Sequence, residues 1–297
     1  MQKDDMVIDN YLSELAKGAA LVRALAAYDE REEIRGRDSL AELFLTDERK
    51  STLKDPSIRE WLVKNYLPYG VYAYTIARTA YFDNLLGRAL CENLPQIVIL
   101  GAGYDSRPYR FADQIKETRI FELDDKQTRA RKLQLLGKAC ITIPGALSFA
   151  DISYEPSRLG ENLVAAGYDK EKQTLFIWEG ATYYQKSEVV DRTIRFMGAN
   201  APAGSTICFD YNTVSGGSDS EIGKELAESM NSVPSEATNL FVLDEWKAGV
   251  FLAEKDFMIL EHITSEEMEK RYLTLQDGST AEKVPARHRI VYASLSK

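Results

Sequence analysis

Two kinds of hydrophobic pattern divide the chain at Pro95. Before Pro95, apolar residues recur every three to four positions, first between Leu12 and Leu25 and again over about 71–93. This spacing predicts amphipathic helices, and no strand-like alternation interrupts them. After Pro95, short β-rich runs alternate with helical patterns. The chain is therefore expected to begin with helices and to continue as an α/β unit.

Five runs after Pro95 are predicted strands, because each is rich in β-branched or aromatic residues. They are IVIL (97–100), TRIFEL (118–123), CITIPGAL (140–147), TLFIWE (174–179) and STICFDY (205–211). Helical patterns lie between them, at 125–138, 156–166 and 187–199. Alternation of strands and helices predicts a parallel, doubly wound sheet.

The last third of the chain departs from this repeat. Residues 212–256 contain a Ser/Gly-rich loop and predicted helices, and we interpret them as an insertion. DFMILEHI (256–263), a short helix at 265–272 and RHRIVYASLS (287–296) then predict a terminal strand pair. The predicted fold is a Rossmann-like, doubly wound, mostly parallel sheet with an antiparallel edge strand. The helical residues 1–94 are expected to cap the domain of residues 95–297 rather than form a separate one.

Charge and composition exclude several functions. The net charge of −9 argues against sequence-independent nucleic-acid binding, which requires clustered cations. The three cysteines and two histidines show no zinc spacing, so no metal site is expected. No apolar run approaches the ~18 residues of a membrane span, and the acidic N-terminus lacks a signal-peptide core. These features predict a cytoplasmic protein with no membrane or nucleic-acid partner.

The loop after the first predicted strand, LGAGYDSRPYR (100–110), contains candidate chemistry. Gly101 and Gly103 allow a tight turn and close approach of the backbone to a ligand. Ser106 stands where a dinucleotide-binding loop has its third glycine, so the following helix is not expected to seat a pyrophosphate. S-adenosyl-L-methionine (SAM), a nucleoside joined directly to a sulfonium, suits such a loop.

Acidic residues end the next three predicted strands. Asp124 is placed to accept hydrogen bonds from ribose hydroxyls, whereas Asp125 is expected to cap the following helix. Asp151 can accept from the adenine amine with Ile152 beside the ring, although an Asp after a strand is equally often a turn or cap residue. Glu179 ends the fourth strand, where it can hold the ribose or the α-ammonium of the cofactor.

These segments together resemble the leucine carboxyl methyltransferase family, which includes protein phosphatase methyltransferases and bacterial O-methyltransferases of polyketide pathways. The matching segments, in the order of the family, are IARTAYFD (76–83), VILGAGYDSRPYRF (98–111), FELDD (121–125), ADIS (150–153), WEGATYY (178–184) and RHRIVYAS (287–294). The resemblance covers roughly residues 38–295. Ile152 departs from the leucine that the family often has, and Arg107 favours the bacterial branch.

The resemblance implies a SAM-dependent methyltransferase that releases S-adenosyl-L-homocysteine (SAH). Arg78 matches the family arginine that binds the methionine carboxylate, a suitable role for a guanidinium. The implied cofactor residues are Arg78, Gly101, Ala102, Gly103, Asp105, Asp124, Asp151, Ile152 and Glu179.

The methyl acceptor is expected to be an oxygen of a small molecule, either a carboxylate or a hydroxyl. Tyr184, Tyr211 and Arg107 are candidate acceptor contacts, while no catalytic residue is identified and a structural role is favoured for His288. Methylation of a protein C-terminal carboxylate is the main alternative. An NAD(P)-dependent oxidoreductase and a non-catalytic SAM-binding protein also stay open, as does the oligomeric state.

Overall fold

A seven-stranded sheet forms the centre of the computed structural model, which describes residues 3–213 and 240–296. Its strands are β1 (Gln96–Leu100), β2 (Arg119–Asp124), β3 (Leu147–Asp151), β4 (Thr174–Trp178), β5 (Thr206–Asn212), β6 (Phe257–Ile263) and β7 (His288–Leu295). They are ordered β3-β2-β1-β4-β5-β7-β6. The first five strands pair in parallel, and β7 runs antiparallel to both β5 and β6.

The strand order reverses between β1 and β4. From β1 the chain proceeds outward through β2 to β3, and it then returns to the other side of β1 for β4 and β5. In open α/β sheets, ligands bind outside the carboxyl ends of the strands at such a reversal. Because β7 is antiparallel, its first residue lies at the same sheet edge, where His288 pairs with Asn212.

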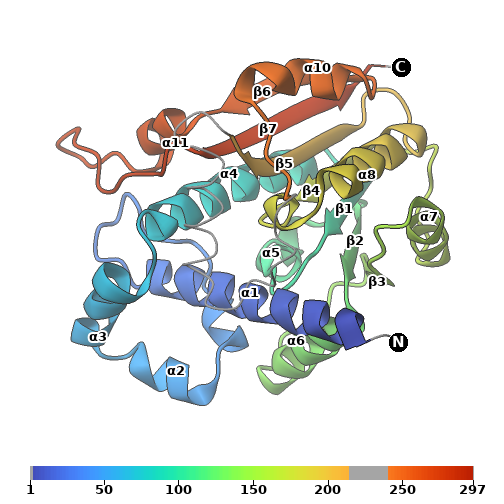
Figure 1. Cartoon of the computed structure of the whole chain (residues 1–297). Helices are drawn as coiled ribbons and strands as arrows, with labels where there is room; N and C mark the ends of the chain where they lie inside the picture. The colour runs from blue at the N-terminus through green and yellow to red at the C-terminus, as the bar shows by residue number, and fades with distance from the viewer. Residues whose placement is uncertain (1–2, 214–239, 297) are drawn as a thin grey trace.

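Alternation along the strands produces two buried faces. Residues such as Ile97, Ile99 and Cys208 belong to one apolar cluster, and Val98, Leu100 and their equivalents belong to another. Helices α1 (Lys3–Ala27), α4 (Val71–Cys91), α6 (Lys126–Lys138) and α11 (Ser265–Tyr272) contribute to the first cluster. Helices α7 (Pro156–Ala165), α8 (Ser187–Ala199) and α10 (Ala248–Ala253) contribute to the second, on the other side of the sheet (Figure 1).

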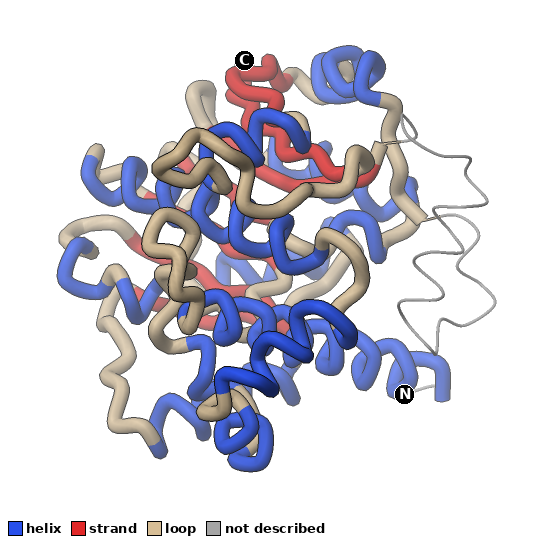
Figure 2. The backbone as a smooth tube through the Cα atoms, turned by 90° about the vertical axis from the view of Figure 1, so that its left-hand side faces the viewer, coloured by secondary structure: helices blue, strands red, loops and turns tan. Residues whose placement is uncertain are grey.

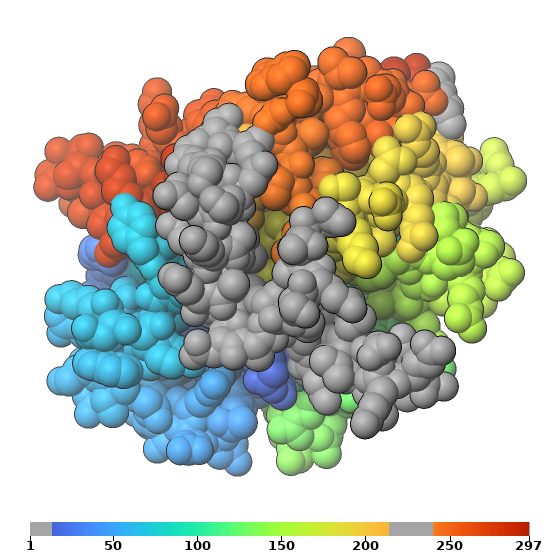
Figure 3. All heavy atoms as spheres, viewed as in Figure 1, coloured from blue at the N-terminus to red at the C-terminus, as the bar shows by residue number. Residues whose placement is uncertain are grey.

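Helices α1 and α4 of the N-terminal region share an apolar cluster with one face of the sheet. Between α1 and α4 lie four shorter elements, namely η1 (Ala41–Phe44), α2 (Asp47–Thr52), α3 (Pro56–Trp61) and the π-helical turn η2 (Leu62–Tyr66). Helix α4 is buried along most of its length, because apolar residues occupy nearly all of its faces. Figure 2 shows the helices around the central strands, and Figure 3 shows the N-terminal third along the lower left of the molecule.

No long helix follows β1. The loop leads into the four-residue helix α5 (Arg107–Arg110), with Pro108 in its first turn, and then into η3 (Ala112–Gln114). The other short elements among the described residues are η4 (Thr182–Tyr184) and η6 (Glu245–Lys247). The predicted difference from a dinucleotide-binding loop is therefore present in the backbone.

The predicted fold class is confirmed, and four of the five predicted parallel strands lie within one residue of their predicted bounds at each end. The strand predicted at 140–147 is wrong, because β3 begins only at Leu147. Cys140 adopts a left-handed backbone conformation (φ 56°) and Pro144 lacks an N–H group, so the intervening residues do not join the sheet.

Two predictions about the organisation of the chain stay predictions in part. Residues 214–239 of the predicted insertion are not among the described residues, and the division into a cap and a domain at residue 94 stays a prediction. Within the described residues, no helix has both the length and the apolar character needed to cross a bilayer.

Candidate functional site

A cavity of about 690 Å³ lies at the carboxyl ends of the parallel strands. It is lined by residues of α1, α4, the loop after β1 and the residues that follow β2 to β5, and it ends at the start of β7. The side of the cavity near Asp124 and Ile152 is here called the β2–β3 end. The side near Glu179 and Asp210 is called the β4–β5 end.

The glycine-rich loop forms the floor of the cavity. Gly101 (φ 63°) and Gly103 (φ 49°) both adopt left-handed conformations, which are costly for residues with a Cβ atom. A Cβ atom on Gly103 would also lie 3.3 Å from the Cβ atom of Ala16 in α1. The loop therefore packs closely against the first helix at Gly103.

Asp124 lies beside this loop. Its carboxylate accepts hydrogen bonds from the backbone N–H groups of Gly103 and, at 2.8 Å, of Asp125. Burial, with a contribution from the nearby Asp125 carboxylate, raises the pKa of Asp124 to about 7. Asp125 caps α6 by accepting from the N–H groups of Gln127 and Thr128, which confirms its predicted structural role.

At the β4–β5 end, Arg78 of α4 meets two carboxylates. Its Nε atom donates to Glu179 at 2.9 Å, and its Nη1 atom donates to Tyr183 Oη at 2.9 Å and to Asp210 at 3.3 Å. Asp210 is fully buried and also accepts from Tyr74 Oη and from the N–H group of Gly180. Burial raises the pKa of Asp210, and the positive charge of Arg78 opposes this shift.

Gly180 makes room for the guanidinium group of Arg78. It has φ 67°, and a Cβ atom there would lie 3.3 Å from both Nη atoms. A larger residue would therefore be strained and would also displace the arginine.

Arg107 forms a second ion pair with Glu179, through the carboxylate oxygen that Arg78 does not contact. The Arg107 guanidinium group donates to Asp83 at 2.9 Å, to Asp105 at 2.7 Å and to Glu179. Burial alone would raise the pKa of Glu179, but Arg107 and then Arg78 outweigh it and lower the pKa to about 2. Glu179 is therefore an ionised carboxylate at neutral pH.

Further ion pairs and hydrogen bonds hold the loop after β1 against α1 and α4. Arg110 donates to both oxygens of Asp83, at 2.8 and 2.7 Å, and to Ser106 Oγ at 2.8 Å. Ser106 in turn donates to buried Asp38 at 2.6 Å, and Asp38 accepts from Arg23 of α1 at 2.8 Å. Buried charges of this kind are tolerated only when they are paired and hydrogen-bonded. The network therefore connects the N-terminal helices to the loop.

Most of the predicted site residues line the cavity. These are Arg78, Gly101, Ala102, Gly103, Asp105, Arg107, Asp124, Ile152, Glu179 and Tyr184. Their assignment to the cofactor or the acceptor stays a prediction.

Two predicted residues do not line the cavity. Asp151 pairs with Arg129 at 2.7 Å and with Lys126 at 3.2 Å, both near the start of α6. Tyr211 donates to or accepts from His262 Nε2 at 2.7 Å within the opposite apolar cluster. Alternation along β5 points Tyr211 away from the face that Asp210 and Asn212 share.

Sequence reasoning missed the acidic residues that hold the arginines. Asp83 lies within the IARTAYFD segment, and Asp210 lies two residues before the end of β5, near the same sheet edge as Asp124 and Glu179. The same rule that selected Asp124 therefore identifies Asp210. Nothing comparable marks Asp38, which lies in an irregular segment after α1.

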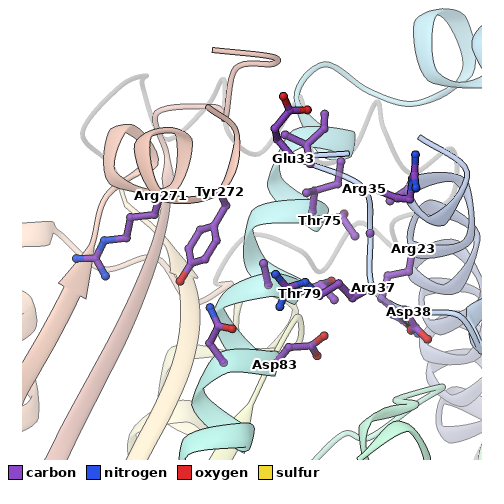
Figure 4. A pocket seen from close by; sticks show the side chains of 16 residues that line it. Arg23, Glu33, Arg35, Arg37, Asp38, Thr75, Thr79, Asp83, Arg271 and Tyr272 are labelled. Carbon is purple, nitrogen blue, oxygen red and sulfur yellow. Dashed lines mark hydrogen bonds and ion pairs between the residues drawn. The ribbon is translucent and has the colours of Figure 1, made fainter. Parts of the chain in front are cut away.

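A smaller cavity of about 200 Å³ lies beside α4 (Figure 4). Figure 4 shows Thr75, Thr79 and Asp83 on α4, facing the segment that follows α1 and residues of α11. None of its lining residues belongs to a strand, so it does not reach the carboxyl ends of the sheet. Among the described residues, no cluster of three or more His, Cys, Asp or Glu side chains has the arrangement of a metal site.

Comparisons with known proteins show that the chain is a SAM-dependent methyltransferase, in agreement with its fold. The model of the leucine carboxyl methyltransferase family matches residues 16–198, and the chain belongs to that family. A Frankia alni protein named "putative S-adenosyl-L-methionine-dependent methyltransferase" is 33% identical over 204 residues, covering 67% of this chain and 68% of that protein. A Bacillus subtilis protein of the same description is 32% identical over 136 residues, or 46% of this chain and 44% of its own length.

Solved structures share the fold at low identity. A Thermobifida fusca protein titled "putative methyltransferase" superposes with a TM-score of 0.58 at 11% identity, covering 94% of each chain. A Streptomyces avermitilis protein of the DUF574 family gives a TM-score of 0.54 at 13% identity, covering 92% of this chain and 96% of that one. These likenesses bear on the fold alone.

Proposed function

We propose that this protein transfers the methyl group of SAM to an oxygen atom of a small-molecule acceptor. The observation that carries the proposal is the pairing of Arg78 with Glu179 in the same cavity as Asp124. A guanidinium and a carboxylate side by side match the α-carboxylate and α-ammonium of an amino acid. A second carboxylate on the far side of the glycine-rich loop matches the two hydroxyls of a ribose.

The residues present fit this cofactor. Arg78 binds Glu179, Tyr183 and Asp210 through Nε and Nη1, which leaves Nη2 for the methionine carboxylate. Glu179 would hold the α-ammonium, and Asp124 would accept from the ribose. Ile152 lines the cavity where the adenine ring would pack, beyond Asp124 on the next strand.

SAM supplies an activated methyl group that leaves a neutral sulfur when it is transferred. The protein therefore has to hold the acceptor oxygen in line with that methyl group and about 3 Å from it. Tyr183 and Tyr184, four and five residues after Glu179, line the same cavity, so they would border the transfer point. The buried ion pairs around Glu179 fix this geometry, because a buried charge cannot leave its partners at low cost.

A small molecule is favoured as the acceptor by the shape of the site. The cavity of about 690 Å³ has to hold the cofactor as well as the acceptor, and the space left beside the cofactor suits a small molecule better than an extended peptide. A protein C-terminal carboxylate is the second candidate, favoured by the family to which the chain belongs.

A methyl-transfer assay with labelled SAM tests the proposal. The acceptor panel should contain matched carboxylic acids and phenols together with peptides that end in a free carboxylate. Label in a small-molecule product supports the proposal, and base-labile label identifies an ester. Label found only in peptides, or on nitrogen or sulfur, would contradict it.

A further inference from the structure

His288 is an unexplained polar residue inside the cavity. It is the first residue of β7 and only 6% exposed, and it lines the cavity. Neither Nδ1 nor Nε2 has a hydrogen-bond partner among the described residues. Buried polar atoms in folded proteins are nearly always hydrogen-bonded. Two ring nitrogens without a partner therefore indicate that a ligand binds at His288.

The ring of His288 is held in a fixed orientation. It stacks on Tyr74 with a centroid distance of 3.7 Å and an interplanar angle of 8°. The Tyr74 hydroxyl is in turn tied to Asp210. Asn212 is the cross-strand partner of His288, and its Oδ1 atom also lacks a partner among the described residues. Two unsatisfied side chains therefore adjoin at the same place in the cavity.

His288 lies at the part of the cavity that the cofactor would leave to the acceptor. In the sheet, β7 lies two strands beyond β4, roughly 10 Å away. Asp124 and Ile152 lie on the opposite side of β4, at β2 and β3. The residues that line the cavity and that the proposed cofactor contacts do not use include Tyr66, Leu67, Pro68, Val71 and Tyr184. These aromatic and apolar side chains suit a planar hydrophobic acceptor.

The chemistry of the ring suits a hydroxyl better than a carboxylate. Burial, and then the charges of Arg287, Arg78 and Arg289, lowers the pKa of His288 well below its ordinary value, so the ring is neutral. A neutral imidazole offers one acceptor nitrogen and one donor nitrogen, without a positive charge to attract a carboxylate. Arg107 is already paired with three carboxylates of the protein, and the remaining Nη2 atom of Arg78 is assigned to the carboxylate of the cofactor.

We propose that the methyl acceptor is a phenol whose hydroxyl donates its hydrogen bond to His288 and loses its proton to that ring. The inference rests on the proposed function. A lone pair of the phenol oxygen forms the new C–O bond to the methyl carbon while the S–C bond breaks and its electrons pass to sulfur. As the C–O bond forms, the hydroxyl becomes strongly acidic, so even a weakly basic imidazole takes its proton and later releases it to solvent.

Nuclear magnetic resonance can observe this contact directly, because the chain has only two histidines. The protein is labelled with ¹⁵N-histidine, saturated with SAH and titrated with 2-naphthol or, as a matched ring, 2-naphthoate. We expect 2-naphthol to shift the ring nitrogens of His288 but not those of His262, whose Nε2 is bonded to Tyr211 outside the cavity. Absence of a shift with 2-naphthol, or an equal shift with 2-naphthoate drawn by Arg287, would overturn the proposal.

Two substitutions separate chemistry from packing. His288→Phe keeps the stacking on Tyr74 but removes both nitrogens, whereas His288→Gln keeps a donor and an acceptor. We expect His288→Phe to lower kcat for labelled methyl transfer to 2-naphthol by about 100-fold, and His288→Gln to recover part of it. The Kd for SAM should change by less than about threefold, because the proposed cofactor contacts lie on other elements than β7.

The outcomes distinguish the inference about His288 from the proposed function on which it rests. If the wild-type protein binds SAM but His288→Phe methylates 2-naphthol at the wild-type rate, or only 2-naphthoate is methylated, the inference about His288 is wrong and O-methylation stands. If the wild-type protein does not bind SAM, the proposed function itself is wrong.

Discussion

The two ends of the cavity are built in different ways. At the β2–β3 end, a backbone turn through Gly101 and Gly103 and one carboxylate, Asp124, form the site. At the β4–β5 end, Arg78 and Arg107 share Glu179 within a buried network of ion pairs. The first arrangement depends on backbone conformation, and the second depends on charges that several elements bring together.

This difference determines what each end can tolerate. A backbone turn of this kind depends on glycine at a few adjacent positions and on one nearby hydrogen-bond acceptor. A buried ion network stays stable only while each charge keeps its partner, so removing one member exposes the others to an uncompensated desolvation cost. Substitutions at the β4–β5 end are therefore expected to damage folding and binding together, whereas those at the β2–β3 end should separate them.

The largest effect is expected for Arg78→Ala. It would leave Asp210 and Glu179 buried with less positive charge, which should lower the free energy of unfolding by about 3–5 kcal/mol and abolish SAM binding. Chemical denaturation and calorimetric titration measure the two losses. Lys64→Ala, which removes an exposed cation on η2, is the matched control and should change neither. A stable Arg78→Ala protein with normal SAM affinity would contradict the role of the network.

Asp124→Asn should instead separate stability from binding. Because the folded pKa of Asp124 is raised to about 7, the protonated form stabilises the native state below its unfolded pKa, and this contribution is lost as the pH rises through 7. The asparagine variant without ligand should therefore be more stable than the wild type at pH 8, and the difference should shrink toward pH 4. Thermal unfolding across this pH range measures the effect.

The same variant should bind SAM roughly 10- to 100-fold more weakly at pH 8, because a charged hydrogen-bond acceptor is lost. Wild-type affinity should rise between pH 6 and 8 as Asp124 ionises. Asp113→Asn, at an exposed position, is the control. Equal stability of wild type and Asp124→Asn at both pH values would show that burial does not perturb this carboxyl.

A smaller effect is expected for Gly180→Ala. The left-handed backbone should cost about 1–2 kcal/mol, and the methyl group would press on the guanidinium of Arg78 and weaken SAM binding. Gly137→Ala is the control, because a Cβ atom there meets nothing within 4 Å and lies in helix α6, where alanine is favourable. Similar affinities for both variants would argue against close packing of Arg78 on Gly180.

The smallest effect concerns Asp151. Its carboxylate is paired with Arg129 and Lys126 outside the cavity, so Asp151→Asn should change SAM affinity by no more than about threefold. A contact with adenine, as the sequence predicts, would give a loss of about tenfold or more. Calorimetric titration of this one variant decides between the structure and the sequence-based prediction.

The two ends also differ in how far the sequence predicts them. Asp124 was predictable because a carboxylate at the end of a parallel strand faces the ligand crevice wherever the strand order reverses. Tyr211, a candidate acceptor contact, does not line the cavity, since one residue along a strand exchanges the two faces of the sheet.

Contacts between distant segments were beyond the sequence. The ion pair of Arg107 with Asp83 depends on how α4 lies across the loop, and the pairing of Asp151 depends on the first turn of α6. The local sequence pattern does not specify the distances between such separate segments. The prediction of a strand at 140–147 was wrong for a local reason. The apolar residues there suggested a strand, but the left-handed conformation of Cys140 places a turn at its start.

Titration with SAM and with 5′-methylthioadenosine, which lacks the amino-acid part, tests the division of the cavity most directly. The proteins are the wild type, Asp124→Asn and Arg78→Lys, which keeps the charge but not the planar fork. We predict that Asp124→Asn weakens both ligands by similar factors, whereas Arg78→Lys weakens SAM by about tenfold or more and 5′-methylthioadenosine by less than about threefold. Equal losses for both ligands in Arg78→Lys, or an unchanged affinity for SAM, would contradict the account.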